Sequence, residues 1–196
     1  MEGTNPVNKK LVAALSGGAA LVVALTGCGG GGESDKKAND WAKTVCDEVQ
    51  PQLKKIQSAN ASIQAASDEQ DSKKLQQTDS KAFKDISEAY TALGKAVHDA
   101  GPPPVDNGEK IQKQAVKELD ATSQAYKDLQ TAVDKLDTSD KAKFAAGLND
   151  IADQLNKLSS SGDQALKKLQ EGKVGKAMAK QPGCQKPKGT STASPS

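Results

Sequence analysis

The chain has 196 residues, with 27 basic residues, all of them lysine, against 25 acidic residues and a single histidine, and its formal charge is +2. Aromatic residues make up only 3% and arginine is absent. The broad basic surface interleaved with arginine or aromatic side chains that nucleic-acid binding uses is therefore not expected. Long Ala-, Lys-, Gln- and Asp-rich stretches, without strand-like runs of Val, Ile and Thr, predict an all-α fold.

The first 28 residues have the parts of a bacterial export signal. Lys9 and Lys10 precede an apolar segment from Leu11 to about Leu25, and small residues follow it. The apolar segment is about 15 residues long, which is short for a membrane-spanning helix. A plain secretory signal and an uncleaved anchor are the alternatives to a lipoprotein signal.

The segment closes on the tetrapeptide Leu-Thr-Gly-Cys that ends at Cys28. This tetrapeptide resembles the lipobox of bacterial lipoprotein precursors. The resemblance implies that diacylglycerol alkylates the Cys28 thiol, that residues 1–27 are removed and that Cys28 becomes the first residue of the mature chain. Two acyl chains attach a protein stably, so it also implies that the membrane is a partner, reached through this lipid at the outer face of the bacterial cytoplasmic membrane.

The remaining chain divides into three parts. Residues 28–37 carry four consecutive glycines and polar side chains, which predicts a flexible tether. Residues 185–196, rich in Lys, Pro, Ser and Thr, predict a disordered tail. Residues 38–184 form one predicted helical domain, because about 150 residues suffice for a single core.

Four helical segments are predicted, each by an apolar stripe with a spacing of three or four residues. The first begins after a cap at Asn39 or Asp40, and Pro51 predicts a kink or a short break in it. We assign Trp41 to its core stripe, with a binding surface or the membrane interface as the alternative. The stripe comprises Trp41, Val45, Val49, Leu53, Ile56 and Ile63.

The second segment runs from about Leu75 to Gly101, where three prolines follow. The third begins near Asp106 as N-cap and contains an i,i+4 pair of Glu109 and Lys113.

The fourth segment follows Asp140 and extends to Leu169 as one bent helix, although Gly162 weakens it. A short fifth element around Val174 and Met178 ends at Pro182-Gly183. The economical arrangement is an antiparallel four-helix bundle with a kinked first helix and disordered N- and C-terminal tails.

The second and third segments share a pattern at an offset of 36 residues, most clearly around Tyr90 and Tyr126. A duplicated helix and two helices that solve the same packing problem both explain it, and we favour the packing explanation. Alanines in the pattern allow close approach of the helices, which leaves little room for a ligand cavity.

Two cysteines remain besides Cys28, and an oxidising exterior predicts that Cys46 and Cys184 form a disulfide. The chain-entropy relation gives at most about 5 kcal/mol for a loop of this length. Two separate thiols for metal or redox chemistry are the alternative, but they lack a Cys-x-x-Cys spacing and nearby histidines.

No other pattern indicates chemistry. His98 is expected in solvent at a helix end, and the acidic cluster Asp68-Glu69-x-Asp71 is expected to be a solvated turn rather than a cation site. Phosphate loops, nucleophile elbows and zinc-protease motifs are absent from the sequence. We therefore predict no enzymatic activity, no catalytic or metal-binding residues and no cofactor.

Beyond the lipobox, the layout resembles small secreted lipoproteins of high-GC Gram-positive bacteria in its glycine-rich spacer, early Trp and Cys, Lys/Ala/Gln-rich helices and late Cys. The resemblance implies a cell-surface or secreted location and no mechanism. The predicted function is a non-catalytic interaction module that contacts an unidentified envelope or extracellular protein and no nucleic acid. The alternatives are a small-ligand or ion-binding lipoprotein that serves a transporter or sensor, and an envelope spacer.

Overall fold

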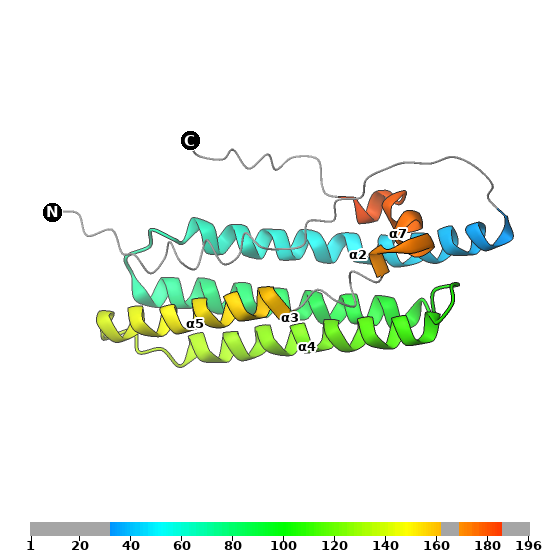
Figure 1. The fold of residues 1–196 in the computed structure, drawn as a ribbon. Helices are drawn as coiled ribbons and strands as arrows, with labels where there is room; N and C mark the ends of the chain where they lie inside the picture. Colours follow the sequence, from blue (N-terminus) through cyan, green and yellow to red (C-terminus); the bar gives the residue numbers. More distant parts are fainter. Residues whose placement is uncertain (1–31, 162–168, 186–196) are drawn as a thin grey trace, which may run out of the picture.

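A computed structural model describes residues 32–161 and 169–185. Within these ranges all regular secondary structure is helical, which confirms the all-α class (Figure 1). The predictions for the signal segment, for Cys28 and for residues 186–196 lie outside the described residues. The elements are α2 (Glu33–Ala65), α3 (Ser72–Asp99), α4 (Gly108–Asp134), α5 (Lys141–Ser161), α7 (Gly172–Ala179) and the short 3-10 helix η1 (Pro182–Cys184).

Helix α2 begins at Glu33, before the predicted cap at residues 39 and 40, so residues 33–37 are helical and not part of a flexible tether. Acidic side chains in the first turn favour the helix start, and the Glu33–Lys37 ion pair of 3.1 Å supports it. The helix continues through Pro51, whose ring lies on the exposed side. The expected interruption is therefore not a break in the helix.

Helices α3 and α4 pack against each other in opposite directions. Helix α3 ends as predicted, and Gly101 follows with a φ of 72°. Helix α4 begins at Gly108 with Asn107 as its N-cap, so the assignment of the cap to Asp106 is wrong. Asn107 has a φ of 61°, a left-handed conformation that asparagine adopts more readily than most residues.

Matched polar contacts join α3 and α4 at the 36-residue offset. The hydroxyl of Ser87 donates to the carbonyl of Ser123, and that of Ser123 donates to the carbonyl of Ser87, each over 2.9 Å. The amide of Gln76 donates to the carbonyl of Val133, at the end of α4, over 2.9 Å. The amide of Gln112, 36 residues later, donates to the carbonyl of Val97, at the end of α3, over 3.1 Å. The two helices therefore use equivalent residues for equivalent contacts, which both explanations of the repeat would produce.

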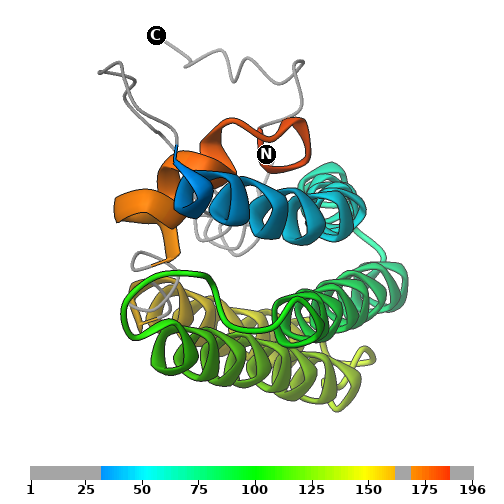
Figure 2. The same cartoon turned by 90° about the vertical axis from the view of Figure 1, so that its right-hand side faces the viewer.

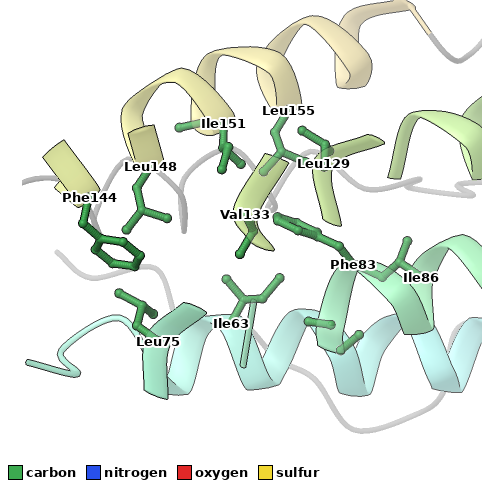
Figure 3. Close-up of a cluster of buried hydrophobic side chains, with 13 residues drawn as sticks. Ile63, Leu75, Phe83, Ile86, Leu129, Val133, Phe144, Leu148, Ile151 and Leu155 are labelled. Carbon is green, nitrogen blue, oxygen red and sulfur yellow. The ribbon is translucent and has the colours of Figure 1, made fainter. Parts of the chain in front are cut away.

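Two apolar clusters fill the interior. The first core cluster joins the end of α2, the start of α3, the end of α4 and helix α5, and Figure 3 shows its side chains pointing toward one another. Helix α5 begins directly after Asp140, as predicted, and Asp140 caps it by accepting hydrogen bonds from the backbone N–H groups of Ala142 and Lys143. The predicted continuation of this helix through Gly162 falls on residues 162–168, outside the described residues. The first core cluster is formed by Ala59, Ile63, Leu75, Ala82, Phe83, Ile86, Leu129, Val133, Phe144, Leu148, Ile151, Ala152 and Leu155.

The second core cluster lies at the other end of the helices. It joins the start of α2, the end of α3, the start of α4 and helix α7, which corresponds to the predicted fifth element and lies beside α2 (Figure 2). The side chain of Trp41 is 7% exposed, which confirms its place in the core. The cluster is formed by Ala38, Trp41, Ala42, Val45, Leu93, Val97, Ala115, Leu119, Leu169, Val174 and Ala177.

Candidate functional site

The two predicted disulfide cysteines come together. Cys46 of α2 and Cys184 of η1 form a disulfide with their Cα atoms 5.0 Å apart, and both side chains are buried. The bond attaches the segment after α7 to α2. Cys28, the predicted lipidation site, lies outside the described residues.

Gly183 explains why the chain can approach α2 so closely. A Cβ atom at Gly183 would overlap the backbone carbonyl of Cys46. Because this carbonyl belongs to a packed helix, it cannot easily move away. Only glycine brings Cys184 to bonding distance here.

Several contacts gather segments that are distant in the sequence at one end of the molecule. The indole nitrogen of Trp41 donates to the carbonyl of Gly101 over 2.9 Å. Lys173 of α7 lies 3.8 Å from the carboxylate of Asp35. We call this end, made of residues 33–41, 100–113 and 172–184, the proximal end, and Figure 1 shows the starts of α2 and α4 there.

The first turns of α4 carry a hollow of about 620 Å³. Its basic side chains, those of Lys110, Lys113 and Lys117, are exposed. Sequence reasoning missed this site because lysines are spread over the whole chain, and only the i,i+3,i+7 spacing signals one shared helix face. We call it the lysine hollow, and it is lined by Asn107, Gly108, Glu109, Lys110, Lys113, Gln114 and Lys117.

A second hollow of about 550 Å³ lies between α2 and α3 near the opposite end. It is lined by hydroxyl, amide and charged side chains of both signs, so it matches a polar protein surface better than an apolar ligand. We call it the α2–α3 groove, and it is lined by Ser58, Ala59, Ser62, Glu69, Lys74, Gln77, Thr78, Lys81, Ala82 and Asp85.

The acidic cluster between α2 and α3 has a local structural role. The carboxylate of Asp71 accepts hydrogen bonds from the backbone N–H groups of Lys73 and Lys74, and thereby caps α3. The carboxylate of Glu69 accepts one from the backbone N–H of Asp71. In the described parts of the chain, no group of three or more His, Cys, Asp or Glu side chains is placed to hold a metal ion.

His98 lies at the C-terminal end of α3 with 74% of its side chain exposed, and its Nδ1 is 3.2 Å from the carboxylate of Asp99. Lys95 also forms an ion pair with Asp99. The hydrogen bond from Lys95, followed by that from His98, lowers the pKa of the Asp99 carboxyl. His98 therefore belongs to an exposed charge cluster at a helix end.

Asp79 is a buried carboxylic acid that the sequence analysis did not single out. It lies on α3 in phase with the core residues Leu75, Ala82 and Phe83, and it is 1% exposed. Neither carboxyl oxygen has a hydrogen-bond partner among the described residues, and burial raises the pKa of Asp79 to about 7. Ala115 occupies the matching position of α4, 36 residues later, so Asp79 breaks the apolar pattern that the two helices share.

Comparisons with protein-family models, curated proteins and solved structures gave no match. None of the helices that the structure describes is long and apolar enough to cross a membrane.

Proposed function

We propose that this protein is a bacterial surface lipoprotein, attached by diacylglycerol on Cys28 to the outer face of the cytoplasmic membrane, whose helical domain is a non-catalytic interaction module. The lipobox that ends at Cys28 carries the proposal. The Cys46–Cys184 disulfide supports it, because disulfides persist in oxidising compartments such as the cell exterior.

The spacing between the proposed lipid site and the first helix supports an orientation in which the proximal end is near the membrane. Four glycines separate Cys28 from Glu33, where α2 begins, and a fully extended chain covers at most about 18 Å over these five steps. The proximal end therefore stays close to the bilayer. The scaffold we propose is an antiparallel four-helix bundle of α2 to α5 with a kink at Pro51, directed outward from that end.

The α2–α3 groove is the face we propose for the protein partner. Its residue Ser62 lies about 40 Å along α2 from the start of the helix, at 1.5 Å per residue, so it is far from the bilayer. Hydroxyl groups of Ser58 and Thr78 and charges of Lys81 and Asp85 give this groove the polar, mixed-charge character of a non-obligate protein interface.

Replacing Cys28 with alanine is expected to release the protein from the membrane, because the thiol that would receive the lipid is lost. Cell fractionation with a detector for the folded domain measures this, and Lys135→Gln, at an exposed position, is the control that keeps the lipid site and the disulfide. Tight membrane retention of the Cys28→Ala protein would show that another feature attaches it.

Placing a tryptophan in the α2–α3 groove is expected to reduce recovery of the partner by tenfold or more, because the ring fills the hollow. The change is Gln77→Trp, and Gln154→Trp on the exposed side of α5 is the matched control. Cross-linking on intact cells followed by mass spectrometry measures the recovery. If wild type and Gln77→Trp recover the same proteins in equal amounts, the groove is not the binding face.

A further inference from the structure

We propose that the lysine hollow binds the phosphate groups of anionic lipids in the membrane that holds Cys28, so that the domain leans on the bilayer through the start of α4. This inference rests on the proposed function, since it needs the proximal end to be held at the membrane. It adds a binding surface that lipidation alone does not supply.

The three lysines share one face of α4. The spacing of Lys110, Lys113 and Lys117 places them on the side of the helix opposite the buried Ala115 and Leu119. They are exposed, and none of them forms an ion pair with any residue that the structure describes. The expected i,i+4 pair of Glu109 with Lys113 is not formed.

The charges around the hollow leave it positive. Among the described residues that line it, Glu109 is the one acidic residue, against three lysines. Asp120, one turn further along α4, points toward α3, where its carboxylate lies 2.9 Å from the position of a Cβ on Gly94. The positive end of the α4 helix dipole lies at Gly108 and adds partial positive charge. The lining therefore matches a phosphate-bearing surface.

The hollow is within reach of the membrane. The hydrogen bond from Trp41, eight residues after the start of α2, holds the loop before α4 against this helix, and Figure 1 shows both helix starts at the same end. The lysines extend over about 10 Å along the axis of α4, from Lys110 to Lys117. A domain that leans on this side can place all three at the headgroups.

The expected strength of lipid binding by the three lysines is enough to orient the domain on the bilayer but not to anchor the protein. One lysine beside an anionic bilayer strengthens binding about fivefold, so three give about a hundredfold. This is weak for a free protein, but a short tether converts the contact into an intramolecular one with an effective concentration in the millimolar range.

The test uses the lipidated protein extracted from its own cells and placed in vesicles of phosphatidylcholine, with or without about 30% phosphatidylglycerol. The acetylation rate of each lysine is measured by mass spectrometry. We expect Lys110, Lys113 and Lys117 to react at least about fivefold more slowly on the anionic vesicles, and about 0.5 M salt to remove the difference by screening. Lys127 and Lys135, toward the far end of α4, should react equally on both.

A pair of variants tests whether the three lysines act together. Lys113→Gln is expected to remove most of the protection of Lys110 and Lys117, whereas Lys135→Gln should leave it intact. Equal rates on the two kinds of vesicle, or equal protection by inorganic phosphate in detergent solution, would overturn the proposal. A protein whose mass lacks the lipid would instead contradict the anchor, and this is seen before the vesicles are made.

Discussion

Replacing both Cys46 and Cys184 with serine is expected to lower the free energy of unfolding by about 2 to 5 kcal/mol. The bond closes a loop of 138 residues, for which the chain-entropy relation gives about 5 kcal/mol as an upper value. The loss of stability should be greatest in α7. Helix α7 packs mainly on α2, and it has only eight residues, too few to be stable alone.

Chemical denaturation of the double-serine protein against wild type measures the global loss, and amide hydrogen exchange measures the local one. We expect exchange in α7 to approach that of an unfolded segment while the α3–α4 pair stays protected. The control is wild type with and without a thiol reductant, which should reproduce the same loss. An unchanged unfolding curve together with a protected α7 would show that the second core cluster holds this segment without the disulfide.

Replacing Asp79 with asparagine is expected to stabilise the protein by about 2 to 4 kcal/mol at pH 8. Burial raises the pKa of this carboxyl from 3.8 to about 7, so the folded state favours its neutral form and the unfolded state does not. Between these two values the folded state binds more protons than the unfolded state, and stability falls as the pH rises from about 4 to about 7. Above about pH 7 both states are ionised and this group adds no further dependence on pH.

Exposed carboxyl groups act in the opposite sense and at lower pH. A hydrogen bond from the Lys55 side chain is the main cause that lowers the pKa of Glu88. A hydrogen bond from the backbone N–H of Lys143 is the main cause that lowers the pKa of Asp140. The contribution of these carboxylates to the free energy of unfolding is present above about pH 4 and is lost as the pH falls further. The fall in stability between about pH 4 and pH 7 therefore reports on Asp79.

Urea unfolding of wild type and Asp79→Asn at pH 5 and pH 8 measures the effect of the buried carboxyl. Wild type should be less stable at pH 8 than at pH 5, and the variant should show little difference. Asp153→Asn, on the exposed side of α5, is the matched control and should keep the dependence of wild type. If Asp79→Asn follows the same pH dependence as wild type, Asp79 is ionised in the folded protein and has a partner.

The features that depend on local pattern could be predicted from the sequence. The apolar stripes identify the helices, Gly101 marks the end of α3, and α5 begins after Asp140 as predicted. The pairing of Cys46 with Cys184 follows from their number and from the compartment that the lipobox implies. These signals act over a few residues or depend on composition alone.

Features that depend on tertiary contacts could not be predicted. The early start of α2 depends on Ala38, which is buried in the second core cluster although it precedes the expected cap. The N-cap shifts from Asp106 to Asn107 because the loop needs a left-handed residue immediately before Gly108. The burial of Asp79 follows from the helices that pack around α3. From the sequence alone, an aspartate beside an apolar stripe is expected at the solvent-exposed edge of the helix.

The lipid anchor on Cys28 is tested most directly by the denatured intact mass of the protein extracted gently from its own cells. The proposed function predicts a chain that begins at Cys28, carries an added diacylglyceryl group and is two hydrogens lighter than the thiol form because of the Cys46–Cys184 bond. A chain that retains Met1, or one that begins at another residue without lipid, would contradict the membrane anchor.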